Sequence, residues 1–447
     1  MEANGEAKMA DDKDVHETQL QVRFSTKLED EKFHVVNTPF AVPSSLNRYG
    51  LSEIINALLG LSDKPIPFDF LLDGELLRTS LETYLLAKNL SAETILEIEY
   101  MPAVLPPSPK EAHLHDDWVS AVDGSLDRFI FTGSYDNLAR VWSSEGVCVR
   151  VLKGHTDAIT SLSLISSSGS SEEDLGLVTT SKDRTVRLWQ KVLPDSASTK
   201  VKSVQPTKCF NGHTSSVQTV ASSPSGSQIA SGAWDSSIKL WNVLDEAEID
   251  EEAAKKRKLN GKGVESNNGE AQVTAQRTLE GHTQCVSQVA YAEEDYLYSV
   301  SWDHSVRSWN LETGDNTSTL NCSKALLCLS IGGEGSALIA TGGADRVLRI
   351  WDPRMVGVAV PVLQLTSHQG WITSCRWHRR STYHILSSSH DGTVKLWDVR
   401  AKVPLHTADA HTDKVFCADW WKDDCIVSGG ADSKLNILHG VKLSGSV

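Results

Sequence analysis

Four residue types that can share protons recur together along the chain. An aspartate returns seven times, at Asp136, Asp183, Asp235, Asp303, Asp345, Asp391 and Asp432. Four residues before each aspartate lies a hydroxyl, at Thr132, Thr179, Ser231, Ser299, Thr341, Ser387 and Ser428. A histidine lies upstream in six units, at His115, His155, His213, His282, His368 and His411. Six residues after the first six aspartates stands a tryptophan, at Trp142, Trp189, Trp241, Trp309, Trp351 and Trp397.

Serine, histidine and aspartate together could form a catalytic triad. The array recurs around the whole chain, however, and no serine stands in the G-x-S-x-G turn that exposes a nucleophile. A structural use accounts for the spacing: the aspartate fixes the histidine tautomer, the histidine meets the hydroxyl, and the hydroxyl accepts the indole N–H. We therefore predict structural tetrads, no catalytic residue and no enzyme activity.

The segment from Gly212 to Trp241 shows which elements must position one tetrad. After Gly-His, apolar and polar residues alternate, a Pro-Ser-Gly turn follows, and two more short runs flank Asp235. Three antiparallel strands fit this pattern, with room for a fourth before the next Gly-His. Because one such sheet cannot bury both faces, the unit has to repeat. The pattern resembles the WD-repeat family and predicts a mainly β chain with a seven-bladed β-propeller.

Two of the seven units depart from the pattern. The fifth has Cys322 in place of the histidine, and the seventh has Leu438 in place of the tryptophan. We expect these two blades to lack complete tetrads. The ring is expected to close with a strand borrowed from the segment just before Trp118, which leaves no long exposed edge.

The N-terminal quarter of the chain follows another pattern. Residues 1–17 are polar and are expected to be disordered. In the range 18–101, strands are predicted at 19–24, 33–36, 67–72, 75–78 and 94–100, with helices at 46–61 and 79–87. This order is that of a small α+β ubiquitin-like domain. A Pro-rich linker at 102–110 and the propeller at 111–447 follow.

The overall composition excludes some functions. The net charge is −15 and the isoelectric point is near 5.5, which argues against a surface built to clamp nucleic acid, although it leaves room for local basic patches. The eight cysteines stand singly, without a C-x-x-C pair, and indicate reduced thiols of a nuclear or cytosolic protein. Neither a signal peptide nor a run of 18 apolar residues is present, so no membrane span is predicted.

A charged insertion is predicted at 244–275, between the third and fourth strands of the third blade. It contains an acidic run followed by Lys255, Lys256, Arg257 and Lys258. A charge run is commonly only a solvated loop, but a basic four-residue cluster in a loop also fits nuclear import.

Aromatic residues gather where the turns of the blades should surround the central channel. The residues just before each aspartate include Tyr135, Trp234 and Trp302, and those three after the histidines include Trp118 and Trp371. Exposed aromatics of this kind form the hot spots of protein interfaces, although some could pack under neighbouring loops. We predict a partner-binding surface on this rim.

The stretches RYGLSEIINALLG, PFDFLLDGELLRTSLETYL and EIEYMPAVLPP resemble the WD repeat-containing protein 12 family of ribosome biogenesis factors. The resemblance covers nearly the whole chain. It implies a nucleolar and nucleoplasmic assembly factor of the large ribosomal subunit, and it therefore favours nuclear import as the role of Lys255 to Lys258. We predict no cofactor. The implied partners are pescadillo, the block-of-proliferation protein and pre-ribosomal particles, with no membrane and no direct sequence-specific nucleic acid contact.

The resemblance also implies a role for the ubiquitin-like domain. In the family, this domain engages the AAA ATPase midasin, which removes the factor from the pre-ribosome. An acidic residue just before the final strand completes a metal site held by midasin. The matching residue in LSAETILEIEY is Glu93.

A different class remains as an alternative. Trp351-Asp-Pro-Arg and Trp397-Asp-Val-Arg are W-D-x-R boxes that resemble those of cullin–RING ubiquitin ligase substrate receptors, in which Arg354 and Arg400 would contact the adaptor. The plainer interpretation is that each arginine pairs with a nearby carboxylate.

Overall fold

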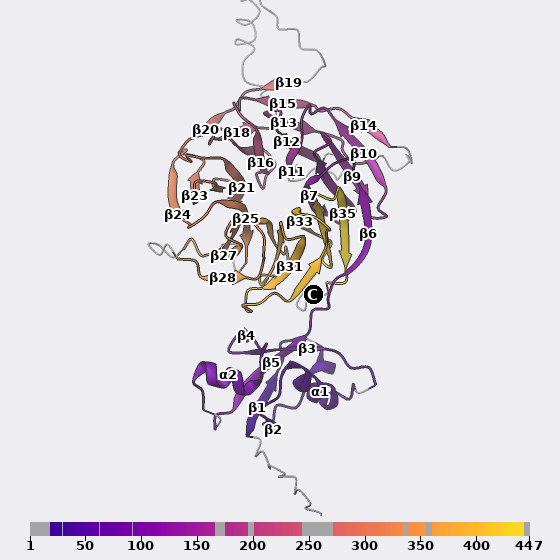
Figure 1. The fold of residues 1–447 in the computed structure, drawn as a ribbon, viewed down its shortest axis with the longest axis vertical. Coiled ribbons are helices and arrows are strands. Elements are labelled where there is room, and N and C mark those ends of the chain that lie inside the picture. The colour runs from indigo at the N-terminus through magenta and orange to yellow at the C-terminus, as the bar shows by residue number, and fades with distance from the viewer. Residues whose placement is uncertain are drawn as a thin grey trace, which may run out of the picture. The chain divides into compact units, whose positions relative to one another are not determined.

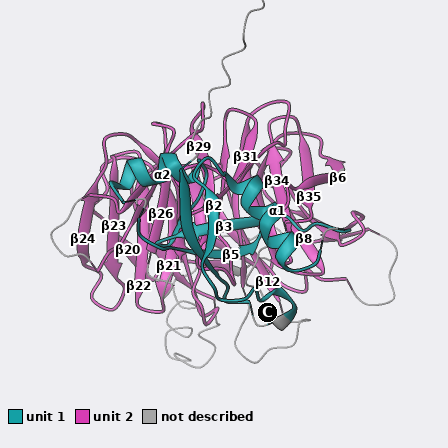
Figure 2. Ribbon diagram, turned by 90° about the horizontal axis from the view of Figure 1, so that it is seen from below, with its two compact units in different colours: residues 1–104, 447 teal, residues 105–446 magenta. Residues whose placement is uncertain are grey.

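A computed structural model of the 447-residue chain describes residues 18–28, 30–61, 63–91, 93–165, 175–194, 201–243, 271–333, 338–354 and 360–441. The chain divides into two compact units, and the boundary falls between Val104 and Leu105. Figure 2 colours unit 1 teal and unit 2 magenta. Each unit is described by itself.

Unit 1 is built on a five-stranded mixed sheet in the order β2-β1-β5-β3-β4. Its strands are β1 (Gln19–Ser25), β2 (Phe40–Pro43), β3 (Phe68–Leu72), β4 (Glu75–Leu76) and β5 (Leu96–Pro102). β1 and β5 pair in parallel at the centre, whereas β2 pairs with β1, and β3 with β5 and β4, in antiparallel fashion. This arrangement is the sheet of a ubiquitin-like fold.

Two helices complete unit 1, α1 (Arg48–Leu58) and α2 (Leu81–Lys88). Ser80 caps the N-terminus of α2, and its hydroxyl accepts a hydrogen bond from the backbone N–H of Thr83 at 3.3 Å. Asn89 caps the C-terminus of this helix, with a φ of 54° in the left-handed region that asparagine tolerates. Unit 1 has a hydrophobic core of its own, made by buried residues that include Phe24, Leu51, Ile55, Phe68, Phe70, Ile98 and Tyr100.

The predicted strand at 33–36 is wrong. A short 3-10 helix, η1 (Glu31–Phe33), stands at its start, and the second strand is β2 instead. The alternation of apolar and polar residues at 33–36 is misleading, because the backbone of this segment bonds to a side chain and not to a neighbouring strand. The Val35 N–H donates to the Tyr100 hydroxyl at 3.0 Å. Val36 consequently points outward and is 69% exposed.

Unit 2 consists of successive antiparallel sheets, drawn in Figure 1 around a common centre. The first sheet contains β7 (Val119–Leu126), β8 (Phe129–Ser134), β9 (Leu138–Ser143) and β10 (Cys148–Lys153). The second contains β11 (Ile159–Ile165), β12 (Gly176–Ser181), β13 (Thr185–Trp189) and β15 (Lys208–Asn211). The third contains β16 (Val217–Ser222), β17 (Gln228–Ala233), β18 (Ile238–Asn242) and β20 (Arg277–Leu279).

Four further sheets follow the same plan. The fourth contains β21 (Val286–Glu293), β22 (Tyr296–Ser301), β23 (Ser305–Asn310) and β24 (Asn316–Asn321). The fifth contains β25 (Leu326–Gly332), β26 (Leu338–Gly343), β27 (Val347–Trp351) and β28 (Leu363–Thr366). The sixth contains β29 (Ile372–Trp377), β30 (His384–Ser389), β31 (Thr393–Asp398) and β32 (His406–Asp409). The seventh contains β33 (Val415–Trp421), β34 (Cys425–Gly430), β35 (Lys434–His439) and β6 (Ser108–Leu114). Unit 2 is therefore the predicted seven-bladed propeller.

The strand that precedes Trp118 supplies the outer strand of the seventh blade, as predicted. β6 pairs antiparallel with β35, and Ala112 lies opposite Asn436. The seventh blade packs against the first, where the Gly124 N–H donates to the Asp419 carboxylate at 3.0 Å. Since β6 starts at Ser108, the last residues of the predicted linker belong to the propeller instead.

Two blades carry a fifth strand that the sequence analysis did not predict. β14 (Lys202–Val204) pairs in parallel with β10 of the first blade, and β19 (Ala271–Val273) pairs in parallel with β15 of the second. The predicted insertion does leave the third blade between β18 and β20. Its residues 244–270 lie outside the described part of the chain.

Apolar residues join neighbouring blades into continuous packing. The indole of Trp241, for example, shares a buried cluster with Phe210 of the second blade and Val217 of the third. None of the helices among the described residues is long and apolar enough to cross a membrane.

Candidate functional site

Four blades hold the predicted tetrad with all its hydrogen bonds. In the second, third, fourth and sixth blades the histidine Nδ1 lies 2.8–2.9 Å from the aspartate carboxylate. The histidine Nε2 lies 2.7–2.8 Å from the hydroxyl, and the indole N–H donates to that same hydroxyl at 2.7–2.8 Å. An ionised aspartate accepts only from a protonated Nδ1, so in the neutral imidazole Nε2 is the acceptor and the hydroxyl donates to it.

A second hydroxyl completes these four tetrads. It lies two residues after the aspartate and donates to the carboxylate at 2.6–2.7 Å; the donors are Thr185, Ser237, Ser305 and Thr393. Burial alone would raise the pKa of Asp183, but the hydrogen bonds from His155 and Thr185 outweigh burial and hold this pKa well below its usual value. The carboxylates of the complete tetrads are therefore ionised.

The first blade departs from the predicted tetrad. His115 Nε2 lies 2.9 Å from the Thr132 hydroxyl, but among the described residues its Nδ1 has no partner. Asp136 instead accepts from Arg140 at 2.6 Å. Leu138 stands where the complete tetrads have their second hydroxyl, so no such group ties the carboxylate to the histidine. Burial, with a further contribution from Arg140, lowers the pKa of His115 to about 4.

The fifth blade repeats this arrangement, and the predicted gap at Cys322 is confirmed. Asp345 pairs with Arg349 at 2.5 Å, and Val347 takes the place of the second hydroxyl. The Trp351 N–H still donates to its hydroxyl at 2.8 Å. Burial raises the pKa of Cys322 to about 11, so this thiol stays protonated and cannot replace a histidine base.

The seventh blade keeps the histidine pair but lacks the indole. His411 lies 2.8 Å from Asp432 and 2.9 Å from the Ser428 hydroxyl. Leu438 is buried in the position of the tryptophan, as the sequence predicts.

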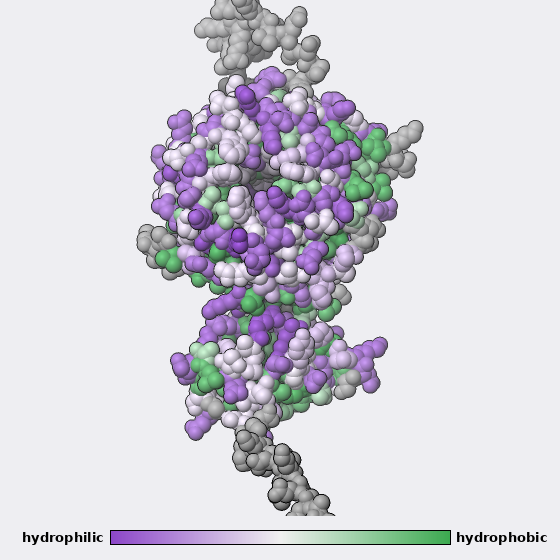
Figure 3. Space-filling view, viewed as in Figure 1, coloured by the Kyte–Doolittle hydropathy of each residue, from purple (hydrophilic) through white to green (hydrophobic). Residues whose placement is uncertain are grey.

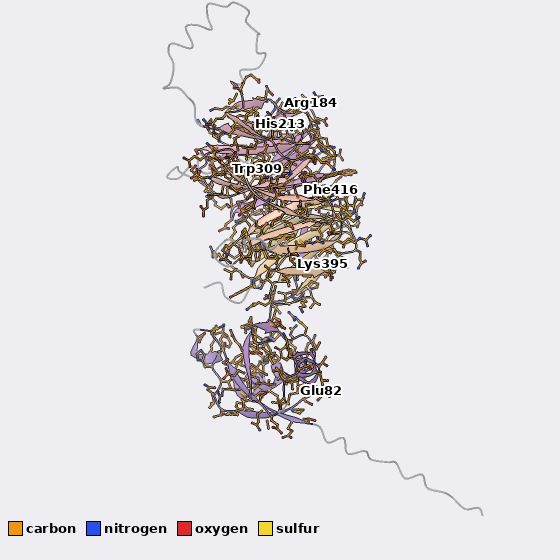
Figure 4. The ribbon with its side chains drawn as sticks, turned by 90° about the vertical axis from the view of Figure 1, so that its left-hand side faces the viewer. Glu82, Arg184, His213, Trp309, Lys395 and Phe416 are labelled. Carbon is orange, nitrogen blue, oxygen red and sulfur yellow. The ribbon has the colours of Figure 1, made fainter. Side chains whose placement is uncertain are left out.

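The tetrads are structural elements of the blades. All seven hydroxyls, from Thr132 to Ser428, have no exposed surface, so no substrate can reach them. His213 and Trp309, labelled in Figure 4, lie within the body of unit 2. In the complete tetrads, each hydroxyl is also hydrogen-bonded to both the indole and the imidazole. None of these hydroxyls is therefore free to act as a nucleophile activated by the histidine.

We expect the replacement Trp241→Ala to destabilise unit 2 by about 3–5 kcal/mol, because it empties a buried site and removes the donor to Ser231. The matched control is Trp234→Ala, which removes an indole that is 45% exposed and should cost less than about 1 kcal/mol. Urea unfolding followed by tryptophan fluorescence measures both. Equal losses would contradict the assignment of Trp241 to the core.

We also expect unit 2 to lose stability between about pH 6.5 and pH 4, because two histidines are buried in the neutral form. The pKa of His115 and that of His384 are each lowered to about 4, chiefly by burial; Asp398 partly opposes the shift at His384. The unfolded chain takes up protons at these residues first, which costs about 2 kcal/mol per histidine at pH 5. His384→Gln should reduce this pH dependence, and His304→Asn, at an exposed histidine, should not. A flat urea midpoint from pH 7.5 to pH 5 would contradict the prediction.

Three of the five predicted rim residues line the mouth of the central channel. A cavity of about 330 Å³ is bordered there by Tyr135, Trp302 and Trp371. Trp118 and Trp234 lie beside it in ring contact with these residues and are 42% and 45% exposed. Figure 3 shows one face of unit 2 with a hollow at its middle.

The structure groups these rings into two clusters. Trp118, Tyr135, Phe416, His390 and Trp371 form a continuous row with ring centroids 5.4–6.4 Å apart, which we call the aromatic crescent. Trp234 and Trp302 form a separate pair with centroids 5.0 Å apart.

The sequence analysis missed Phe416, which is labelled in Figure 4. It stands five residues after His411, where four other blades carry a small hydroxyl residue (Ser120, Thr160, Ser287 and Thr373) and the remaining two carry Gln218 and Leu327. Because Val415 before it is buried in the blade, strand alternation turns Phe416 to the channel. The available signal was an aromatic ring at a position where no other blade has one.

Glu93 lies in unit 1 on the exposed connection between α2 and β5. Its backbone N–H donates to the Ser91 hydroxyl at 3.2 Å, which holds the turn. Its carboxylate makes neither a hydrogen bond nor an ion pair to a described residue, and the neighbouring Leu90 and Ile95 are 40% and 47% exposed. A free carboxylate flanked by exposed apolar side chains has the character of a contact surface.

Each of the two W-D-x-R arginines pairs with the aspartate of its own box. Arg354 donates to both oxygens of Asp352 at 2.9 and 2.8 Å, and Arg400 does so to Asp398 at 3.0 and 2.6 Å. This is the plainer of the two interpretations of these boxes. The predicted import cluster, Lys255 to Lys258, lies outside the described residues.

The tetrads, the seven blades and the small mixed domain define a WD-repeat protein with an N-terminal accessory domain. Family models agree: "WD domain, G-beta repeat" matches seven segments, residues 110–143, 146–190, 204–242, 274–310, 314–352, 359–398 and 402–437. The "NLE (NUC135) domain" matches residues 20–85.

The whole chain also has named relatives. It is 49% identical over 429 residues to "Ribosome biogenesis protein WDR12 homolog" of Arabidopsis thaliana, covering 95% of this chain and 98% of the relative. The protein of that name in Oryza sativa subsp. japonica is 49% identical over 430 residues, covering 95% and 97%. "Ribosome biogenesis protein YTM1" of Eremothecium gossypii is 36% identical over 453 residues, covering 95% and 98%. The chain therefore belongs to the WDR12/YTM1 family of ribosome biogenesis proteins.

Proposed function

We propose that the chain is a non-enzymatic scaffold in the assembly of the large ribosomal subunit. The observation that carries this proposal is the similarity to ribosome biogenesis proteins across both units, at 49% identity over 95% of the chain. The burial of the tetrads supports a non-enzymatic role, because the hydroxyls of the repeated Ser/Thr-His-Asp array are inaccessible to a substrate. The protein would act in the nucleolus and nucleoplasm, and the basic cluster at Lys255 to Lys258 would direct its import.

The two units would have separate tasks. The propeller would join the pescadillo and block-of-proliferation proteins through the channel mouth, where Trp118, Trp234 and Trp371 are exposed. Unit 1 would engage midasin through Glu93. A carboxylate with no partner in its own chain is suited to complete the coordination of a hard ion such as Mg²⁺ held by another protein.

Affinity purification of the tagged chain from nuclear extract, followed by mass spectrometry, tests the proposal. Pescadillo, the block-of-proliferation protein and large-subunit ribosomal proteins should be enriched over a tagged unrelated propeller. Enrichment of a cullin adaptor in their place would refute it. The pairing of Arg354 and Arg400 with their own aspartates gives that alternative no support.

A further inference from the structure

The seventh blade contains an open apolar space at a place that a tryptophan side chain occupies in complete blades. We call it the seventh-blade notch, a cavity of about 310 Å³ whose lining includes Ala408, Ala410, Leu438, Ala112, Pro107 and Pro109. It lies between β32, the outer strand of the sixth blade, and the pair β35–β6. Leu438 at its base is 4% exposed.

The complete blades show what normally occupies this space. In the third blade the indole of Trp241 packs on the ring of Phe210, with centroids 5.6 Å apart, and a Cβ on Gly212 would meet that indole at 3.3 Å. Phe210, on β15 of the second blade, and Gly212 lie three and one residues before His213, the histidine of the third blade. The same positions before His411 are Ala408 and Ala410, so the notch has the place of the missing indole.

The seventh blade also lacks a long cationic side chain beside the notch. In the second blade, a Cβ on Gly154 would meet the Arg187 guanidinium at 2.9 Å and the indole of Trp189 at 3.0 Å. Gly281 has the corresponding neighbours in the fourth blade. The seventh blade has Asn436 at the arginine position, and its amide donates to the Ala410 carbonyl. A short amide and a leucine thus replace an arginine and a tryptophan two residues apart.

The outer strand beside the notch is available for pairing. β6 is the last strand of its sheet, and no described strand pairs with its other edge, whereas β10 and β15 each carry an added parallel strand. Leu114 of β6 is 71% exposed, and Asp409, an exposed acidic residue of β32, is among the residues that border the notch. Such an edge can accept an extended peptide, which then places alternate side chains on one face.

We propose that the seventh-blade notch binds an extended segment of a partner polypeptide, which inserts an aromatic side chain and carries a lysine or arginine two residues before it. The segment supplies the two groups that the blade lacks. The aromatic ring fills the space over Ala408 and Leu438, and the cation lies near Asp409. The proposal is independent of the ribosomal role, since it depends only on the comparison among the seven blades.

The probe is a fluorescein-labelled peptide with the sequence of β13, acetyl-Thr-Val-Arg-Leu-Trp-amide, titrated into the full chain and followed by fluorescence polarisation. Binding should weaken at least tenfold when the peptide tryptophan is replaced by alanine. Leu438→Trp should weaken it at least tenfold, because the new indole occupies the notch and can donate to Ser428; this variant should also melt at a higher temperature. Ala112→Glu, at an exposed position on β6, should weaken it without affecting folding.

Val147→Glu is the matched control, an exposed apolar residue of the first blade whose replacement should leave the affinity unchanged. The proposal is overturned if the wild-type chain does not bind the probe, or if it binds the alanine peptide equally well. It is also overturned if Leu438→Trp and Ala112→Glu bind undiminished. Should Leu438→Trp fail to fold, Ala112→Glu and the peptide pair still decide the outcome.

Discussion

Replacing Glu93 with alanine is expected to abolish metal-dependent attachment of the chain to midasin and to leave both units folded. The carboxylate serves no described contact within its own unit, so its loss should not destabilise the fold. A divalent ion that loses an oxygen ligand binds its partner far more weakly, and we expect a loss of at least about tenfold, or about 1.4 kcal/mol. Glu93→Asp should also bind poorly, because the shorter side chain does not reach.

The measurement is capture of the full chain by the midasin metal-binding domain, with and without EDTA. Glu82→Ala is the matched control, since Glu82 is an exposed carboxylate of the same unit on α2 and is labelled in Figure 4. Equal capture of wild type and Glu93→Ala, or capture indifferent to EDTA, would end the claim.

Replacing both Trp234 and Trp302 with alanine is expected to weaken binding of the propeller to the pescadillo and block-of-proliferation proteins by about 2–4 kcal/mol. The two rings pack on each other at the channel mouth, where one is 45% exposed and the other borders the cavity. A partner that covers them would bury two indoles at once. Calorimetry with the purified partner complex measures the change.

The aromatic crescent provides the comparison for this pair. Trp371→Ala with Phe416→Ala removes two rings of the crescent and leaves Trp234 and Trp302 in place. If partner binding spans the whole mouth, both double variants lose affinity, and if it is confined to one side, only one does. A Trp234/Trp302 variant that unfolds, or one that keeps full affinity, would show that these rings are not a binding surface.

The repeat itself could be predicted because its spacing is set by backbone geometry. Each aspartate sits in a turn of fixed length between two strands, so Asp235, Ser231 and Trp241 keep their offsets in every complete blade. The incomplete tetrads of the fifth and seventh blades could be predicted from Cys322 and Leu438 alone.

The first blade was mispredicted because four matching residue types do not guarantee four matching contacts. The arginine four positions after the aspartate takes the carboxylate only where the residue two positions after the aspartate is not a hydroxyl; the seventh blade, with Lys434 and Asn436 at these positions, keeps the pair of His411 with Asp432. A hydroxyl such as Thr185 ties the carboxylate to the histidine, whereas Leu138 leaves Asp136 to the arginine four residues on. Arg187 stands at that same position in a complete tetrad, so the arginine alone is not a signal.

Long-range pairing could not be predicted from local patterns. β14 and β19 add to blades that precede them in the chain, and three-residue strands carry little periodicity. The segment at 33–36 alternates like a strand, but its backbone is held by Tyr100, which lies more than sixty residues away in sequence. Such contacts are decided by tertiary packing.

The central claim is that this chain is carried on precursors of the large ribosomal subunit and is released through unit 1. Sucrose-gradient sedimentation of the tagged chain from nuclear extract tests it most directly. The account predicts that wild type divides between large-subunit precursors and lighter fractions, and that Glu93→Ala accumulates on the precursors. A wild-type chain found only in light fractions, with Glu93→Ala distributed in the same way, would contradict it.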